Sequence, residues 1–235
     1  MGPLRYLAAV VISLVCAIAE LLLIFVDRKK GRVFHAIARG WAKAVLFVGG
    51  VNVAVRGLER IDSERNYVYV SNHASMVDIP AILAGIPDQI RVVYKKELEI
   101  IPFFGWGLKY GAYIGINRGH GSEALKSLDE AITRIRHGAS VLLYAEGTRT
   151  SDGKLQPFKR GAFNLAVKAG VPVVPLTVNG SYSILRKNSF TIKPGAVELV
   201  LDAPIEVPRG EAKDAERKLM EDVHAAIERH YIDQE

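Results

Sequence analysis

From residue 51 onward, short runs rich in β-branched and aromatic residues alternate with stretches of helical periodicity. The strand-like runs cover residues 51–58, 66–72, 91–96, 112–117, 140–146, 171–180 and 197–202. Helices are predicted over residues 77–85, 121–137, 160–169 and 211–231. Such alternation is typical of an α/β fold, so we predict a mixed, largely buried β-sheet flanked by helices over residues 51–235.

The beginning of the chain has a different pattern. Residues 7–26 are apolar except for Glu20, and as a helix they would extend about 30 Å, the thickness of a bilayer's hydrocarbon layer. This pattern fits a spanning helix, a helix within one leaflet, or a secretory signal. The signal is the weakest of the three, because the apolar run continues to Val26 where a cleaved peptide should have become polar.

A basic amphipathic stretch follows the apolar run. The sequence DRKKGR at residues 27–32 holds four cations, which by the positive-inside tendency places the rest of the chain in the cytoplasm. Over residues 33–50 one predicted helix face holds Phe34, Ile37, Trp41, Val45 and Val48, and the other holds His35, Arg39 and Lys43. This helix suits either a bilayer surface, which we favour, or packing on the main domain. We therefore predict that residues 1–50 are two membrane-anchoring helices and that residues 51–235 form the α/β domain.

Charge and cysteine content exclude several classes. The formal net charge of +6 lies entirely in residues 1–60, and residues 61–235 carry 22 charges of each sign. No basic run interleaved with aromatic residues follows, so nucleic acid is not expected as a partner. The single cysteine, Cys16, excludes an intrachain disulfide and a cysteine-based metal cluster, and we expect no metal site.

The segment NHASMVD, residues 72–78, raises the first chemical hypothesis. His73 and Asp78 are five residues apart and cannot share a helical face, but they can meet if His73 lies in the loop after a strand and Asp78 in the first turn of a helix. A carboxylate that holds one imidazole nitrogen lets the other nitrogen take a proton from a hydroxyl. A structural role is the alternative, because Ser75 and Asp78 also match a helix-capping pattern.

Further cations lie at the ends of two other predicted strands and before a predicted helix. The sequences INR at 116–118, EGTR at 146–149 and PFKRGAF at 157–163 each bring at least one. Residues 91–193 carry 16 Lys and Arg against seven Asp and Glu, a local excess of +9. Open α/β sheets bind ligands at the carboxyl ends of strands, so we predict an anionic ligand there.

These blocks together carry a family resemblance. In order, NHASMVD, KKELEIIPFFGWGLKYG, INR, EGTR, PFKRGAF and VPVVPL are similar to the blocks of glycerolipid acyltransferases, and in particular to the 1-acyl-glycerol-3-phosphate acyltransferases. The resemblance covers about residues 50–200. Two positions depart from the family pattern: Ala145 stands where proline is usual, and Asn117 stands where aspartate is common.

The resemblance implies roles for particular residues. His73 would be the general base and Asp78 its orienting partner. The residues that would bind the acceptor's phosphate are Arg118, Glu146, Gly147, Thr148, Arg149 and Lys159. Phe103, Phe104 and Trp106 would line an acyl tunnel or enter the bilayer interface, although core packing is a competing interpretation.

The implied reaction transfers a fatty acyl group from acyl-CoA or acyl carrier protein to the sn-2 hydroxyl of lysophosphatidic acid, giving phosphatidic acid. No cofactor beyond the thioester co-substrate is expected. The expected location is the inner membrane of the cell, with the catalytic domain on the cytoplasmic face. Alternatives are another lysophospholipid or glycerol-3-phosphate as acceptor, a membrane-tethered thioesterase or esterase, and a non-catalytic lipid-binding protein.

Overall fold

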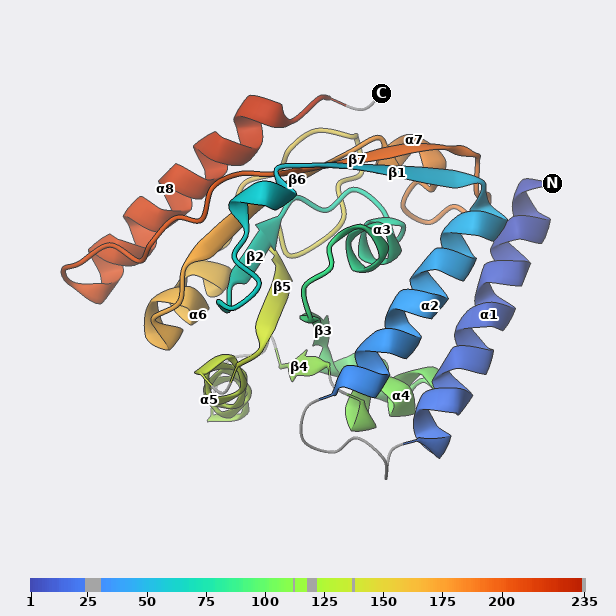
Figure 1. The fold of residues 1–235 in the computed structure, drawn as a ribbon, viewed down its shortest axis with the longest axis horizontal. Coiled ribbons are helices and arrows are strands. Elements are labelled where there is room, and N and C mark those ends of the chain that lie inside the picture. The colour runs from blue at the N-terminus through green and yellow to red at the C-terminus, as the bar shows by residue number, and fades with distance from the viewer. Residues whose placement is uncertain (24–30, 112, 118–121, 137, 234–235) are drawn as a thin grey trace.

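The computed structural model describes residues 1–23, 31–111, 113–117, 122–136 and 138–233, and its centre is one seven-stranded sheet (Figure 1). All seven predicted strands are present, as β1 (Val51–Arg56), β2 (Val68–Ser71), β3 (Ile90–Lys95), β4 (Ile114–Ile116), β5 (Ser140–Tyr144), β6 (Val173–Asn179) and β7 (Gly195–Leu201). The strand order is β1-β7-β6-β2-β5-β3-β4. Neighbouring strands are parallel except β6 and β7, so the sheet is mixed, as predicted.

Helices surround this sheet. They are α1 (Gly2–Leu22), α2 (Arg32–Gly49), α3 (Asp78–Gly85), α4 (Phe104–Tyr110), α5 (Ser122–Arg136), α6 (Gly161–Ala169), α7 (Ser181–Ile184) and α8 (Ala212–His230). Two 3₁₀ turns, η1 (Leu58–Arg60) and η2 (Lys96–Ile100), complete the set. The four helices predicted after residue 51 are confirmed. The short helices α4 and α7 were not predicted, because one or two turns leave too few positions for a periodic pattern.

Side chains that alternate along the strands pack into two apolar layers, one on each face of the sheet. Tyr69 of β2 packs with α2 and α3 on one face of the sheet, whereas Val68 and Val70 pack with α5, α6 and α8 on the other. Every residue of β2 and β6 is buried, as expected for central strands covered on both faces. The sheet therefore provides a rigid platform for the loops that follow its strands.

Helix α2 is amphipathic, but its buried face differs from the predicted one. The residues that it buries are Phe34, Ala38, Ala42, Leu46 and Gly49, and this face packs against α3 and the sheet. Of the predicted apolar stripe only Phe34 is fully buried, because alanines and a glycine allow a closer approach than the bulky residues. Trp41 donates its indole N–H to Ser13 Oγ of α1, 2.9 Å away.

His35, which was predicted on the helix face opposite the apolar stripe, is not fully exposed to solvent. Its side chain is half-buried, and its Nε2 is buried without a hydrogen-bond partner. Burial, reinforced by Arg39 and Arg91, lowers the pKa of His35 to about 4. This imidazole is therefore neutral at physiological pH and acts as part of the packing.

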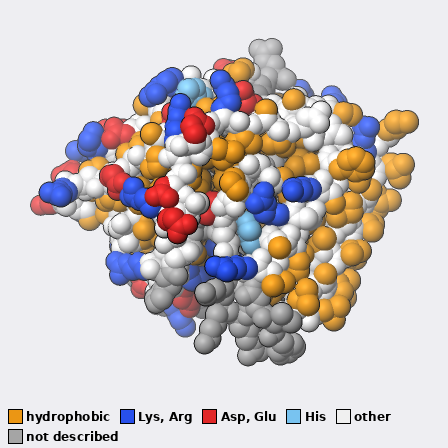
Figure 2. All heavy atoms as spheres, viewed as in Figure 1, with side chains coloured by type: hydrophobic (Ala, Val, Ile, Leu, Met, Phe, Trp, Pro, Cys, Tyr) orange, Lys and Arg blue, Asp and Glu red, His pale blue; other side chains and the backbone are white. Residues whose placement is uncertain are grey.

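Helix α1 lies beside α2 and also packs against α4 (Figure 1). It has the length and hydropathy to cross a membrane, and 11% of its most apolar 18-residue stretch is buried. Its exposed apolar residues are Leu4, Leu7, Val10, Val11, Leu14, Val15, Ile18 and Leu22. Figure 2 shows hydrophobic side chains gathered on the side of the molecule where α1 lies.

The one acidic residue of α1 faces the protein. Glu20 is 7% exposed and accepts a hydrogen bond from the hydroxyl of Tyr113, with 2.9 Å between the oxygens. Its carboxylate also lies close to Gly107 of α4, where a methyl group would stand 3.4 Å from Glu20 Oε2. A polar contact thus fixes the C-terminal part of α1 to the loop between α4 and β4.

Candidate active site

The candidate site lies where β2 and β5 end at the same edge of the sheet. The two strands are adjacent and parallel, with Ser71 beside Tyr144, so the loops that follow them leave the sheet side by side. Ala145 extends the pairing, since its N–H donates to Ser71 O over 3.1 Å. In the glycerolipid acyltransferases that the sequence resembles, proline is usual at this position. A proline has no N–H and could not make this bond.

His73 and Asp78 meet as the spacing predicts. His73 lies in the loop after β2, Asp78 begins α3, and His73 Nδ1 is 2.7 Å from Asp78 Oδ2. The Asp78 side chain is fully buried, and that of His73 is 16% exposed. Because Nδ1 is engaged by the carboxylate, Nε2 is the ring nitrogen that remains to accept a proton.

The structural alternative for Asp78 is realised in the loop before α3, although the N-cap residue of this helix, Val77, makes no side-chain hydrogen bond. Its Oδ2 accepts the backbone N–H groups of Ala74 and Ser75, each over 2.9 Å, and Ser75 Oγ accepts the N–H of Val77. One carboxylate therefore shapes the loop that carries His73 and holds the imidazole within it. The two interpretations of the motif are compatible.

Asn72 anchors the same loop to the opposite neighbour of β2. Its side-chain amide donates to Val178 O over 2.9 Å and accepts from Val178 N over 2.8 Å, which ties the loop to β6. Both groups of the amide are thus satisfied in a buried place. The asparagine of the motif is therefore structural and fixes where His73 begins its loop.

Tyr144, the last residue of β5, supports the imidazole from one side. Its ring stacks on that of His73, with 3.8 Å between centroids and 14° between planes. Its hydroxyl is buried without a hydrogen-bond partner, and burial together with the charge of Asp78 raises the pKa of Tyr144 well above its usual range. No motif in the sequence marks this residue, which lies two positions before Glu146.

Glu146 joins the loop that follows β2 to the loop that follows β5. Its Oε1 accepts the N–H of His73 over 2.6 Å, its Oε2 accepts the N–H of Gln156 over 3.3 Å, and the side chain is almost fully buried. Burial raises the pKa of Glu146 to about 7, although the two backbone hydrogen bonds lower it in part. A further bond joins the loops, from the N–H of Thr150 to His73 O over 2.8 Å.

Several cations were predicted to bind an anionic ligand, and they lie together next to the loop that Glu146 holds. Thr148 and Lys159 are exposed and Arg149 is half-buried. Gly147 has a φ of +73°, and the Lys159 side chain lies across it so closely that a Cβ there would be 3.0 Å from Lys159 Cδ. Lys187, which was not predicted, donates to Thr148 Oγ1 and to Arg149 O. Arg118, also predicted for this ligand, lies outside the described residues.

The aromatic residues predicted for an acyl or membrane contact lie apart from the core. Phe103, Phe104 and Trp106 are 43%, 37% and 43% exposed, so core packing does not account for them. Phe103 has a φ of +60° at the start of α4, which is an unfavourable conformation for a residue with a side chain. The neighbouring Ile100 and Ile101 are exposed too, so η2 and α4 add to the apolar surface of α1.

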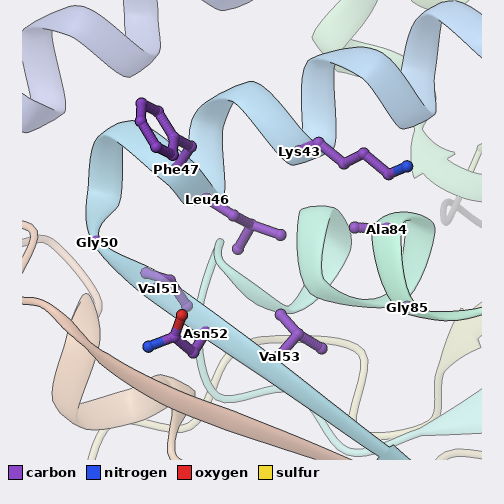
Figure 3. Close-up of a pocket in the computed structure, with 9 residues that line it drawn as sticks. All are labelled: Lys43, Leu46, Phe47, Gly50, Val51, Asn52, Val53, Ala84 and Gly85. Carbon is purple, nitrogen blue, oxygen red and sulfur yellow. The ribbon is translucent and has the colours of Figure 1, made fainter.

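A separate groove lies on the other side of α3. It has a volume of about 540 Å³ between the end of α2, the start of β1 and the end of α3 (Figure 3). Its lining includes Leu46, Phe47, Val51 and Lys43, and none of the residues predicted for the site. In the described parts of the chain no group of three or more His, Cys, Asp or Glu residues is arranged to hold a metal ion.

Comparisons with known proteins indicate the family to which the chain is related. The family model described as Acyltransferase matches residues 52–179. The chain is 32% identical to the chloroplastic 1-acyl-sn-glycerol-3-phosphate acyltransferase BAT2 of Brassica napus, over 84% of this chain and 58% of the relative. It is 35% identical to the 1-acyl-sn-glycerol-3-phosphate acyltransferase of Pseudomonas aeruginosa, over 72% of this chain and 66% of that protein.

A solved structure shows the same fold. The crystal structure of the 1-acyl-sn-glycerophosphate (LPA) acyltransferase PlsC of Thermotoga maritima superposes with a TM-score of 0.79 at 27% identity, covering 97% of this chain and 93% of that one. The chain spans only about half to two thirds of the length of the curated relatives it matches. Since the family model covers more than half of the sequence, and its matched residues include His73, Asp78 and the Glu146–Arg149 block, this chain belongs to the acyltransferase family.

Proposed function

We propose that this chain transfers a fatty acyl group from an acyl thioester to the sn-2 hydroxyl of 1-acyl-glycerol-3-phosphate and so makes phosphatidic acid. The observation that carries the proposal is the 2.7 Å contact between His73 Nδ1 and the buried carboxylate of Asp78. It fixes the imidazole in the tautomer that can act as a general base through Nε2. The names of the relatives support the acceptor and the product.

The chemical step is a direct transfer. The acceptor hydroxyl oxygen attacks the thioester carbonyl carbon while its proton passes to Nε2 of His73, and the carbon–sulfur bond then breaks. The leaving thiolate takes the proton back from the imidazolium, so the base is regenerated. General base catalysis of this kind supplies roughly 10²–10⁴-fold of rate. The thioester is carried by coenzyme A or by acyl carrier protein, and no further cofactor takes part.

The acceptor's phosphate binds to Arg149 and Lys159, the cations next to the loop that Glu146 holds. Arg149 follows Gly147 by two residues, the Lys159 side chain lies across Gly147, and Thr148 adds an exposed hydroxyl. Arg118 joins them on the strength of the family resemblance alone. The buried carboxylate of Glu146 is occupied by backbone N–H groups, so we assign it to holding the loop and not to contact with the phosphate.

The chain works at a lipid surface, because both acceptor and product live in a bilayer. The outer face of α1 and the exposed aromatic residues Phe103, Phe104 and Trp106 form the apolar side that supports this location. We place the protein at the inner membrane of the cell with the α/β domain on the cytoplasmic face, where the soluble thioester is available. The long apolar residues of this side are also the place where the acyl chains meet the protein.

The test follows acyl transfer from a long-chain acyl-CoA to 1-acyl-glycerol-3-phosphate in detergent micelles. We expect phosphatidic acid from the native chain and at least a hundredfold less from His73→Ala. The matched control is His224→Ala, which removes a half-buried histidine of α8. Thioester consumption that yields free fatty acid would indicate a thioesterase instead. Full activity of His73→Ala would refute the mechanism.

A further inference from the structure

The segment that follows α7, residues 185–192, joins three parts of the molecule that the proposed reaction requires. It begins at Leu185, directly after the last turn of α7, and leads to β7. No recognisable pattern in the sequence distinguishes it. Its contacts nevertheless reach the loop of His73, the Thr148–Arg149 pair and the start of α1.

The first contact is with the loop of the catalytic histidine. Ser75 Oγ donates a hydrogen bond of 2.8 Å to Leu185 O, and both residues are buried. The N–H of the same serine donates to Asp78 Oδ2. The beginning of the 185–192 segment is therefore held in a fixed position relative to the His73–Asp78 pair.

The second contact is with the predicted phosphate site. Lys187 Nζ lies 3.3 Å from Thr148 Oγ1 and 3.2 Å from Arg149 O. An ammonium group has three donors, and these two bonds leave one for a ligand. Neither partner carries a negative charge, so the positive charge of Lys187 is not neutralised by these two bonds. A cation held by neutral acceptors beside an arginine is a favourable partner for a phosphate.

The third contact is with the membrane helix. Phe190 packs edge to face against Tyr6, with 5.3 Å between ring centroids, and the N–H of Ile192 donates to Gly2 O over 3.4 Å. Phe190 is nevertheless 68% exposed, and two residues of α1, Leu4 and Leu7, are 69% and 58% exposed. The segment thus continues the apolar surface of α1 at its N-terminal end, three residues from Lys187.

We propose that the 185–192 segment recognises the lysophospholipid acceptor as it leaves the bilayer, with Lys187 bound to its phosphate and Phe190 in the lipid surface. The proposal rests on the proposed function and deepens it. A phosphate with two negative charges needs more than one cation, and Lys187 supplies a charge beside Arg149. Lys187 and Phe190 are three residues apart, so one short segment presents both a cation for the phosphate and an apolar side chain for the lipid surface.

The first test removes the charge of Lys187. We expect Lys187→Met to raise the KM for 1-acyl-glycerol-3-phosphate roughly tenfold, the loss of one charge-assisted hydrogen bond, with the KM for acyl-CoA and the melting temperature nearly unchanged. Lys187→Arg should restore most of the native KM. The matched control is Lys193→Met, an exposed lysine of the same connection that lies beyond the segment.

Two results would overturn the role of Lys187. One is an unchanged KM for the acceptor. The other is a rise in both KM values with a fall in melting temperature, which would mean that the lysine only holds the loop. Titration calorimetry of 1-acyl-glycerol-3-phosphate with the chain in detergent measures the same step without turnover. Weaker binding by Lys187→Met therefore supports the inference even if the native chain proves to catalyse another transfer.

The second test concerns the lipid surface. We expect Phe190→Ser to raise the KM severalfold for long-chain acceptor presented in vesicles of phosphatidylglycerol and phosphatidylethanolamine, and to leave the KM for a monomeric hexanoyl acceptor unchanged. The reason is that only the vesicle substrate must be taken from a bilayer. Equal effects on both substrates would show that Phe190 acts through packing on Tyr6, and would refute its place in the lipid surface.

Discussion

Three different groups fix the imidazole of His73. Asp78 holds Nδ1, Tyr144 stacks on the ring, and Glu146 binds the backbone N–H of the same residue. A base fixed in this way loses little entropy when the hydroxyl arrives. Each of the three groups can be removed on its own, and each removal has a different expected result.

Asp78→Asn tests the orientation of the ring. An amide oxygen can accept only part of the three hydrogen bonds that Asp78 Oδ2 now accepts, and the amide no longer favours an imidazolium in the transition state. We expect kcat to fall by roughly 10²-fold or more, with the KM for the acceptor changed little. Steady-state kinetics decide the matter. A kcat within a factor of two of the native value would mean that Asp78 only shapes the loop through the N–H groups of Ala74 and Ser75.

Tyr144 separates stacking from hydrogen bonding. Its hydroxyl is buried and has no hydrogen-bond partner. Tyr144→Phe removes this unsatisfied donor, so the free energy of unfolding should stay equal or rise by about 1 kcal/mol. Tyr144→Leu removes the stacked ring and should lower kcat severalfold. Chemical denaturation and kinetics of the two variants provide the measurement. A clear loss of activity in the phenylalanine variant would show that the hydroxyl takes part in the reaction.

Glu146 should make stability depend on pH. Its pKa is about 7 in the folded chain and lies near 4.5 when the chain is unfolded, so the folded state binds more protons between these values. The free energy of unfolding contributed by this residue is therefore complete below pH 4.5 and falls as the pH rises through 7. Glu146→Gln cannot titrate. From pH 5 to pH 8 the native chain should lose on the order of 2–3 kcal/mol relative to this variant.

Asp152→Asn is the matched control for that experiment. The carboxylate of Asp152 is exposed, and hydrogen bonds from Thr150 and from the Lys154 N–H lower its pKa, so it stays ionised from pH 5 to pH 8. Its removal should leave the pH dependence in this range unchanged. If the native chain instead gained stability over Glu146→Gln as the pH rose, the buried carboxylate would have to be stabilised in its charged form.

At the residue scale the sequence was informative where a motif encodes its own geometry. The spacing of His73 and Asp78, with the predicted strand and helix around them, was enough to predict that they meet. Motif membership does not tell which way a side chain points: Glu146 was predicted to bind the phosphate, and in the structure its carboxylate accepts two backbone N–H groups. Tyr144 and Lys187 were missed, because their roles arise from contacts between loops far apart in the chain.

At the scale of the elements, the site depends on how β2 is tied to its neighbours. Asn72 joins the loop after β2 to β6 through two buried hydrogen bonds. Asn72→Leu removes both, and the free energy of unfolding should fall by about 2–4 kcal/mol. Urea denaturation measures this change. A stability equal to that of the native chain would mean that the loop and β6 find other partners for these backbone groups.

The elements themselves were largely predictable. Each of the seven strands holds β-branched or aromatic residues between turn signals, and α5, α6 and α8 carry long periodic patterns. The order of the strands was not predicted, because the reversal between β6 and β7 follows from packing that no local pattern encodes. The buried face of α2 was misjudged for a related reason, since its alanines become core residues only through the helix that lies against them.

At the scale of the whole molecule, many of the exposed apolar side chains gather on one side. The outer face of α1 continues into η2 and α4, and Figure 2 shows this asymmetry as a concentration of hydrophobic side chains. The double substitution Leu7→Lys and Leu14→Lys should lower binding to phosphatidylglycerol vesicles at least tenfold, because both residues are exposed and neither contributes to the core.

Vesicle sedimentation measures that binding, and the melting temperature in detergent serves as its control. We expect the melting temperature to stay within about 2 °C of the native value, since surface substitutions rarely change stability by more than about 0.5 kcal/mol. The matched variant is Lys213→Glu together with Arg217→Glu on the solvated face of α8, which should leave vesicle binding unchanged. Undiminished sedimentation of the α1 variant would refute the membrane role of this face.

The hydrogen bond between Glu20 and Tyr113 has a consequence for the order of events during synthesis. The two residues are 93 positions apart, and ribosomes add about 5–20 residues per second, so α1 exists for roughly 5–20 seconds before Tyr113 is made. In that interval the apolar helix can already enter a lipid surface while its carboxyl group has no partner from α4 or from the loop after it. The contact between Glu20 and Tyr113 can therefore close only after this interval, and its formation reports that the α/β domain has assembled against α1.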